Sequence, residues 1–354
     1  MKIYIALLLV VLINIFFETR FSIFTIKNFR VNTRNLSFFS CFIFILLLGI
    51  LRHERLGVDV EIYKKYFLST YSNTDFKFFI GNFNYDIGYV ALNKIVKIFT
   101  NDFRIFEVII FCISFCIFSL IIYKESKYPA LSFLIYIALD FVGFNMCILR
   151  QAVACALCFL AYYFLEKNKK IWYILLVMLA ITFHKTAIFF FLSYFLSLNK
   201  KNIFSFTKNL IYIFIFYLGS NLILPKLIGI YTNDYTNMII VGQGFNLFLF
   251  YLISVMIMRL IYNKECSNID IMRYDCSLGT LYIQVGALSF ALFTRITRYF
   301  AIIFTLSIPN IVYKSKYRSL YIIIYCIMFS ILYLYVLYSN ETNILPYKSV
   351  FSII

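Results

Sequence analysis

Long apolar runs, separated by short charged stretches, recur through the whole chain. Each run spans about 15–22 residues, the length that a helix needs to cross the hydrocarbon core of a bilayer. A soluble domain is about half apolar, whereas 63% of this chain is hydrophobic, more than one globular core can hide. The sequence therefore predicts an all-α, polytopic integral membrane protein.

The order of runs and charges predicts about twelve membrane helices in a single transmembrane domain, residues 1–354. The sequence shows no clear internal repeat and no soluble domain. One long run, 171–198, carries His184 and Lys185 near its middle, and we interpret it as two short helices that meet at His184. The expected helices cover 3–17, 36–51, 105–122, 130–146, 152–165, the two parts of 171–198, 210–224, 245–261, 277–293, 299–313 and 320–338.

Compact basic clusters in short loops predict which side of the membrane each loop faces. The loop from Arg20 to Arg34 and the lysine clusters at 167–170 and 200–201 are expected in the cytoplasm, where such loops are retained. A further inner loop is expected at 263–275. With two short helices meeting at His184, both lysine clusters stay inside and this histidine lies at the outer face.

Two loops are expected outside. The first covers residues 52–104 and ends in an amphipathic interfacial helix at 86–99, which is too short and too charged to span. The second covers residues 225–244. We therefore expect a multi-pass membrane protein whose site lies at the outer face of the membrane.

Charge and motif content exclude several classes of protein. In a soluble protein the net charge of +17 would suggest nucleic acid, but the basic residues are scattered and no nucleic-acid-binding motif is present. Cys112 and Cys116 share a helical face, yet no histidine or carboxylate completes a metal site. The P-loop, HExxH and Rossmann motifs are also missing. We predict no metal, no cofactor and no nucleic-acid partner.

Two polar positions interrupt the stretch 145–184. Arg150 and Gln151 lie between apolar runs, and His184 ends the next run. Ionisable groups are expensive inside a membrane, so they mark functional sites by default. A snorkelling arginine and a structural histidine are the alternatives. A histidine at this position can act as a general base near neutral pH.

Four arginines lie at expected outer ends of helices: Arg52, Arg150, Arg295 and Arg298. The last two are three residues apart and share one face of a helix. Guanidinium groups bind phosphate through paired hydrogen bonds. We therefore expect these arginines to bind a lipid pyrophosphate, with Arg150 also contributing to catalysis.

Further candidates lie in the first outer loop and in one span. Asp59 could orient sugar hydroxyls, accept a proton or pair with an arginine, and a solvated loop is the alternative. Tyr63 and Tyr89 could stack on sugar rings. Asp140 lies in the middle of an apolar run, as a proton-coupled transporter would require.

Four segments resemble, in order, the EpsG family, relatives of the Wzy polysaccharide polymerases. The first, LRHERLGVDVEIYKKYF, carries Arg52, Gly57, Asp59 and Tyr63, and NYDIGYVALNKI carries Asp86, Gly88, Tyr89 and Asn93. The third, NMCILRQAVA, carries Asn145, Arg150 and Gln151, and the run after it ends in Phe183 and His184. The last consists of FTRITRYF and LPYKSVF. One departure is Asp86, where glutamate is expected more often.

The resemblance implies a multi-pass protein of the bacterial inner membrane whose site faces the periplasm or the exterior. Its expected fold is that of a GT-C-like, all-helical membrane glycosyltransferase with short and interfacial helices at the outer face. Such polymerases transfer a growing chain from undecaprenyl pyrophosphate to the sugar hydroxyl of an incoming lipid-linked repeat unit. Either His184 or Asp59 would be the base. A flippase and a chain-length regulator are the implied protein partners. We assign sugar binding to Tyr63, Asp86, Tyr89, Asn145 and Gln151.

Three other functions compete with a polymerase. A flippase or transporter of lipid-linked oligosaccharides would also place arginines around a cavity, although it should show two repeated halves. A polysaccharide ligase would act on similar substrates. A membrane acyltransferase could use His184.

Overall fold

The structure is a computed structural model. It describes residues 1–21, 23–26, 29–54, 56–69, 86–198, 211, 214–215, 217–218, 244–262, 266–288 and 292–351, with only the backbone of 23–26, 29–31 and 292. The expected helix at 210–224, for the most part, and the expected loop at 225–243 lie outside this range.

The described residues are almost entirely helical. The only strands among them form a short antiparallel hairpin, β1 (Ile23–Ile26) and β2 (Phe29–Asn32). The helices are α1 (Lys2–Arg20), α2 (Thr33–Ile50), α3 (Val60–Ser69), α5 (Ile87–Phe99), α6 (Phe103–Glu125), α7 (Pro129–Ala138), α8 (Phe141–Cys147), α9 (Leu149–Glu166), α10 (Lys170–Phe183), η1 (Lys185–Phe191, a 3₁₀-helix), α11 (Leu192–Ser197), α14 (Phe245–Ile261), α15 (Asn268–Ala287), α16 (Leu292–Ala301), α17 (Phe304–Tyr313) and α18 (Arg318–Ser339).

The prediction of an all-α, multi-pass membrane protein is confirmed. Within the described ranges, six helical segments are long and apolar enough to cross a bilayer, or seven if a bent pair counts as one span. Five of the six are α1, α2, α6, α9 and α18, and the sixth is 293–313. The total of about twelve helices remains a prediction.

The expected span 130–146 is two helices rather than one. α7 and α8 meet at an angle of 58°, and Asp140 between them has left-handed backbone angles, φ 58° and ψ 30°. Aspartate adopts this region more readily than apolar residues do. The expected break at His184 is present, since α10 ends there in extended backbone, φ −157° and ψ 117°.

The expected inner loop at 263–275 is wrong in its second half. Helix α15 begins at Asn268 and is started by a capping box, in which Ser267 and Asp270 each bond the backbone of the other. Polar residues there suggested a loop, but they cap a helix. Helix α15 ends at Ala287, six residues before the expected end at 293. Arg295 and Arg298 lie in a separate short helix, α16.

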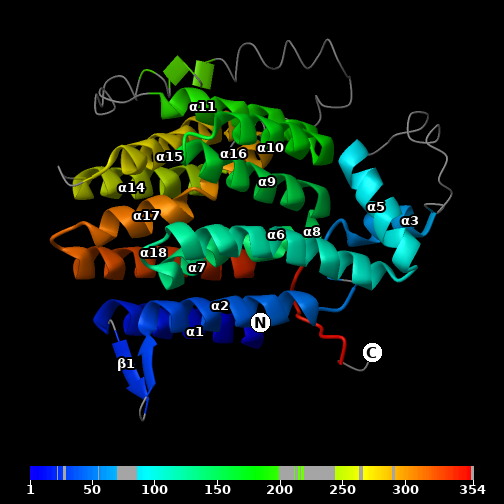
Figure 1. Cartoon of the computed structure of the whole chain (residues 1–354), viewed down its shortest axis with the longest axis horizontal. Helices are drawn as coiled ribbons and strands as arrows, with labels where there is room; N and C mark the ends of the chain where they lie inside the picture. Colours follow the sequence, from blue (N-terminus) through cyan, green and yellow to red (C-terminus); the bar gives the residue numbers. More distant parts are fainter. Residues whose placement is uncertain are drawn as a thin grey trace. The chain divides into compact units, whose positions relative to one another are not determined.

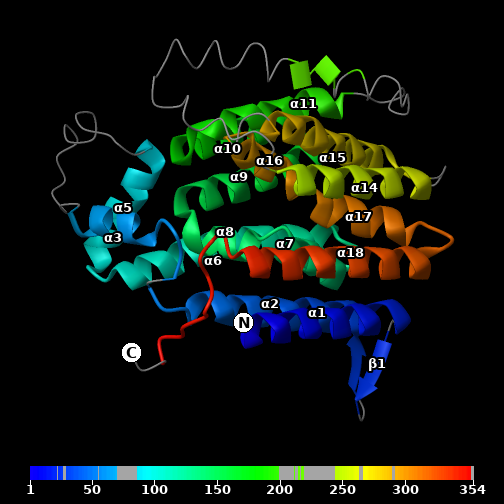
Figure 2. The same cartoon turned by 180° about the vertical axis from the view of Figure 1, so that it is seen from behind.

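The chain divides into two compact units, residues 1–185 with 317–354 and residues 186–316. This division does not test whether the chain is one domain, which stays a prediction. In the first unit, α1 packs on α2 and α7, α6 on α2 and α9, α7 on α18, and α9 on α10. Both views show the β1–β2 hairpin at one end of these long helices and α3 with α5 at the other (Figures 1 and 2).

Residues at the hairpin end hold the turn between α6 and α7. Arg34 donates to the carbonyl oxygens of Tyr123 and Ser126, where α6 ends. Glu18 accepts from the backbone N–H of Ala130, in the first turn of α7, at 3.0 Å. A cation at a helix C-terminus and an anion at an N-terminus both complement the helix dipole.

In the second unit, α15 is the central element. It packs on α11, α14, α16 and α17, and its residues are buried from Arg273 to its last residue, Ala287. One polar contact in this core joins the hydroxyls of Ser277 and Ser307, which lie 3.0 Å apart. This unit carries Arg295 and Arg298, whereas the first unit carries every other predicted site residue.

Candidate functional site

Helices α9 and α10 bring Arg150 and His184 to the same end of the first unit. The two helices pack along each other and are joined by a tight turn, 167–169, in which Asn168 is left-handed, φ 58°. Two consecutive helices joined by such a short turn run antiparallel. The start of α9, with Arg150, therefore lies at the same end as His184, which caps α10.

Helix α5 closes this end because glycine allows a close approach. A Cβ atom on Gly88 would lie 2.4 Å from Thr182 Oγ1 and 3.0 Å from the Thr182 carbonyl oxygen. The first turn of α5 therefore packs on the backbone of the last turn of α10. This contact places Asp86, the N-cap residue of α5, beside His184.

The Asp86 carboxylate lies between the two predicted functional groups. Its Oδ2 accepts a hydrogen bond from Arg150 Nη1 at 3.2 Å and lies 3.7 Å from His184 Nδ1. Although Asp86 is the N-cap residue, its side chain forms no capping bond to α5. The carboxylate thus contacts Arg150 and His184 and not the backbone of α5. We call Asp86, Arg150 and His184 the Asp86 cluster.

Exposure within the Asp86 cluster is graded. The Asp86 side chain is 8% exposed, that of His184 16% and that of Arg150 25%. The carboxylate is therefore shielded from solvent, whereas the ring and the guanidinium are partly accessible. The 3.7 Å between Asp86 Oδ2 and His184 Nδ1 is longer than a hydrogen bond. A closer approach of the carboxylate would fix the tautomer of the histidine and leave Nε2 to accept a proton.

Asp59 lies apart from these contacts, just before α3. Its carbonyl oxygen accepts from the N–H groups of Ile62 and Tyr63, both at 3.2 Å, which starts the helix. Asp59 is partly exposed to solvent. The structure gives no ion pair for its carboxylate among the described residues, and its role as a base remains a prediction.

The residues predicted to bind sugar are buried. Taken as whole residues, their exposed fractions are 4% for Tyr63, 9% for Asp86, 0% for Tyr89, 0% for Asn145 and 1% for Gln151. The Tyr63 and Tyr89 rings pack 5.6 Å apart in an aromatic cluster that includes Phe106. Asn145 Nδ2 donates to the hydroxyl of Tyr136. Ring stacking on a sugar needs an open ring face, so the sugar-binding assignments remain predictions.

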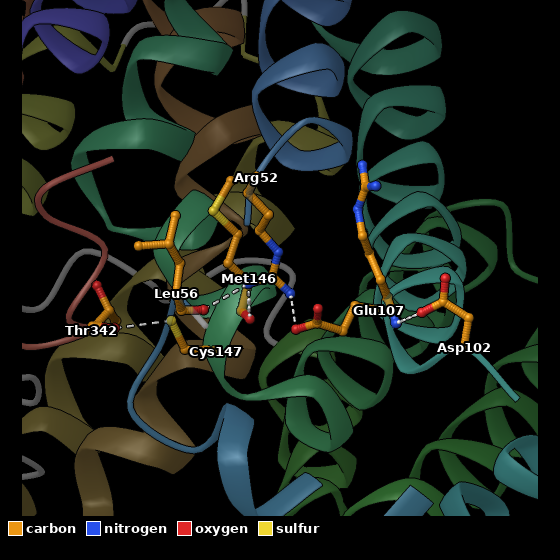
Figure 3. A network of polar contacts seen from close by, with 8 residues as sticks. Arg52, Leu56, Asp102, Glu107, Met146, Cys147 and Thr342 are labelled. Atoms are coloured by element: carbon orange, nitrogen blue, oxygen red, sulfur yellow. Dashed lines mark hydrogen bonds and ion pairs between the residues drawn. The ribbon is translucent and has the colours of Figure 1, made fainter. Parts of the chain in front are cut away.

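Arg52 is held in a buried network rather than at the surface (Figure 3). It is 3% exposed, and Nη2 pairs with Glu107 Oε1 at 2.7 Å. Nη1 donates to the carbonyl oxygens of Leu56, at 3.0 Å, and Met146. Removing one partner of such a buried pair typically costs about 3–5 kcal/mol. The guanidinium that was predicted to bind pyrophosphate thus binds carbonyl groups and a carboxylate.

Arg295 and Arg298 belong to the second unit, where they share one side of α16. Arg295 is exposed and Arg298 partly so. Between and beside them, Thr297 and Tyr299 are buried, and the Tyr299 hydroxyl lies 3.1 Å from Thr186 Oγ1. The predicted convergence of these arginines with Arg150 remains a prediction.

Two features of the site escaped the sequence analysis. Glu107, the partner of Arg52, is the one acidic residue in the apolar run 105–122, and an acid in such a run is itself a functional signal. The contact of Gly88 with Thr182 carries no comparable signal, because only the folded chain brings the two together. Across the described ranges, no group of three or more His, Cys, Asp or Glu side chains could hold a metal ion.

Comparison with known proteins gives one match. A family model described as the EpsG family matches residues 35–349. The matched range includes all the site residues discussed above. No curated protein and no solved structure matches the chain.

Proposed function

The chain belongs to the EpsG family, a Wzy-type family of membrane polysaccharide polymerases that act on lipid-linked oligosaccharides, and from this premise we propose its reaction. The growing glycan is transferred from undecaprenyl pyrophosphate to a sugar hydroxyl of the incoming lipid-linked repeat unit, at the outer face of the membrane. The protein uses no metal for this step.

His184 is the general base in this proposal. Its Nε2 takes the proton of the acceptor hydroxyl as the hydroxyl oxygen attacks the anomeric carbon of the growing chain. The bond from that carbon to the pyrophosphate oxygen breaks, and undecaprenyl pyrophosphate leaves with the electron pair. Asp86 holds the ring through Nδ1 and stabilises the imidazolium that forms.

Arg150 stabilises the negative charge that develops on the leaving pyrophosphate. A fixed guanidinium does so without reorganising, and loss of one such contact typically costs a few kcal/mol, about 10²-fold or more in rate. Pyrophosphate binding by Arg295 and Arg298 is also part of this proposal. Arg52 is left out, because its side chain is only 3% exposed and already binds Glu107 and two carbonyl oxygens.

The observation that carries the proposal is the shared Asp86 carboxylate. Arg150 at 3.2 Å and His184 at 3.7 Å come from helices whose sequence positions are far from Asp86. A histidine oriented by a carboxylate and a partly exposed arginine form a base beside an anion-binding group. Proton transfer from a hydroxyl and departure of a pyrophosphate require those two groups.

The test uses cells that lack the chromosomal gene and express variants of the full chain. We expect Arg150→Ala and His184→Ala to abolish long-chain polysaccharide and to accumulate single lipid-linked repeats at the outer face. Protein level and membrane insertion should persist. The matched controls are His53→Ala, the other of the two histidines, and Arg318→Ala, an exposed arginine at the start of α18.

Two results would contradict the proposal. Full-length polymer from cells carrying both changes would remove Arg150 and His184 from the reaction. Repeat units trapped at the inner face would indicate a flippase instead.

A further inference from the structure

The short break between α8 and α9 determines where Arg150 lies. Helix α8 ends at Cys147, α9 begins at Leu149, and Ile148 between them has non-helical angles, φ −111° and ψ 64°. We call residues 146–148 the α8–α9 junction. Arg150 follows the junction by two residues, so a shift of the junction moves the guanidinium.

Two stretches of the chain contact the α8–α9 junction, the loop 52–57 and the segment at Thr342, and Figure 3 shows one hydrogen bond from each. Arg52 Nη1 donates to the Met146 carbonyl oxygen. Gly57, at φ 126°, packs on Cys147 so closely that a Cβ there would lie 2.8 Å from Sγ. On another side, Cys147 Sγ donates to the Thr342 carbonyl oxygen at 3.0 Å.

Arg52 is itself fixed from both sides. Glu107 of α6 binds its guanidinium at 2.7 Å. The C-terminal tail binds its backbone neighbours, because His53 N–H donates to the Lys348 carbonyl oxygen at 2.8 Å and Val350 N–H donates to that of Leu51 at 3.0 Å. Three directed hydrogen bonds therefore hold this buried guanidinium in one position.

We propose that Arg52 is a positioning residue, which with Glu107 and the C-terminal tail holds the α8–α9 junction and so directs Arg150 toward the substrate. This role rests on the proposed function of Arg150. It replaces direct binding of pyrophosphate by Arg52, and the two roles respond differently to removal of Glu107.

A double-variant experiment separates positioning from direct binding. Arg52→Gln alone leaves the Glu107 carboxylate buried without its cation, so both the melting temperature of the purified protein and the amount of long polymer should fall. Arg52→Gln with Glu107→Gln removes that unpaired charge. We expect the double variant to regain melting temperature and at least about tenfold more long polymer than the single variant, that is, one decade in rate.

Two results of that experiment would overturn the positioning role. Arg52→Gln could make full-length polymer at the normal level, which would show that the Arg52 guanidinium is not needed to hold the junction. Alternatively, the double variant could regain its melting temperature without any polymer, which would show that the guanidinium itself contacts the substrate.

A second experiment measures the accessibility of Cys147 and does not depend on polymer formation. It uses a conservative substitution of Arg52. Arg52→Lys keeps the positive charge but cannot reach Glu107 and both carbonyl oxygens together. Cys147 is fully buried, so N-ethylmaleimide should label it slowly in the detergent-solubilised protein, as located by peptide mass spectrometry. We expect Arg52→Lys to raise labelling of Cys147 severalfold and to leave Cys158, in the body of α9, protected.

The control for this measurement is Arg34→Lys, which changes another arginine bound to backbone carbonyls, at the opposite end of the same unit. It should not alter labelling of Cys147. Unchanged labelling in Arg52→Lys would overturn the positioning role alone. An active Arg150→Ala variant would instead defeat the proposed function, whatever the labelling shows.

Discussion

At the scale of single residues, Asp86 and Asp102 occupy the same kind of position and do different things. Both are N-cap residues, of α5 and α6. Asp102 Oδ1 accepts from the backbone N–H of Arg104 at 2.9 Å, as a capping aspartate ordinarily does. The Asp86 side chain makes no such hydrogen bond to α5 and contacts Arg150 and His184 instead. This contact with two functional candidates, in place of a local cap, supports the proposed role of Asp86.

Asp86→Asn should therefore reduce polymer formation by about 10²-fold or more, the contribution of a general base held in the right tautomer and orientation. The amide keeps the shape of the side chain but loses the charge that holds both partners. Rates of chain growth in membranes, normalised to protein level, measure the effect. Asp86→Glu should retain much of the activity, because it keeps the charge.

Asp102→Asn is the matched control for that substitution. Asparagine caps helices as well as aspartate does, so this variant should behave as the wild type. Equal losses in Asp86→Asn and Asp102→Asn would show that Asp86 contributes only to folding.

The same comparison shows what the sequence could and could not reveal about the site. Arg150 and His184 were recognisable because each is an ionisable residue beside apolar runs. Asp86 was recognised as a candidate, but for sugar binding, since nothing in the sequence says that α5 meets α10. Arg52 was also recognised, yet its burial depends on Glu107, which is 55 positions away.

At the scale of helices, the packing of α5 on α10 depends on a single missing side chain. Gly88→Ala would place a methyl group 2.4 Å from Thr182 Oγ1 and 3.0 Å from backbone atoms that cannot rotate away. Overpacking of this kind costs about 1–3 kcal/mol. We expect α5 to shift from α10 and polymer formation to fall sharply, with a modest loss in melting temperature. Ile98→Ala, on an exposed position of α5, should leave both unchanged.

Helix α15 provides a stability prediction that depends on pH. Burial raises the pKa of Asp270, but hydrogen bonds from Lys314 and Ser267 more than offset it, so the pKa lies below its ordinary value. A lowered pKa in the folded state stabilises the protein at a pH above the ordinary value, about 4, and this stabilisation is lost as the pH falls through the lowered value. The melting temperature should therefore drop as the pH is lowered from about 5.

Lys314→Met tests the origin of that drop. The Lys314 ammonium lies 2.5 Å from Asp270 Oδ2. The variant lacks this ion pair, so its melting temperature near neutral pH should be lower than that of the wild type. The further decrease of the melting temperature in acid should be smaller. Lys316→Met changes an exposed neighbour and should leave the curve of the wild type intact. A variant Lys314→Met with the same acid dependence as the wild type would remove the ion pair as the cause.

At the scale of the whole molecule, the sequence predicted the helices better than their interruptions. Apolar length located α1, α2, α6, α9, α14 and α18 to within a few residues, because the bilayer itself sets that length. The break at Asp140 and the start of α15 at Asn268 were missed. Both depend on local backbone bonding, through a left-handed aspartate and a capping box, which hydropathy does not measure.

The arrangement of the first unit also bears on which side of the membrane the site faces. Lys167 pairs with Glu125 at 2.8 Å, and Arg34 binds the carbonyls beside Glu125, so the α9–α10 turn and the β1–β2 hairpin share one end. The Asp86 cluster lies at the other end, with the starts of α5 and α9. The basic turns are expected in the cytoplasm, which would leave the Asp86 cluster outside.

Epitope tags inserted at two turns test that orientation in intact cells. A tag between Thr100 and Asn101, where α5 meets α6, should bind antibody without permeabilisation. A tag between Asn168 and Lys169, in the α9–α10 turn, should bind only after the membrane is opened. Both insertions fall between helices, so chain length of the polysaccharide can confirm that each tagged protein still folds. The reverse accessibility would place the Asp86 cluster in the cytoplasm, where a polymerase of exported, lipid-linked repeats could not reach its substrates.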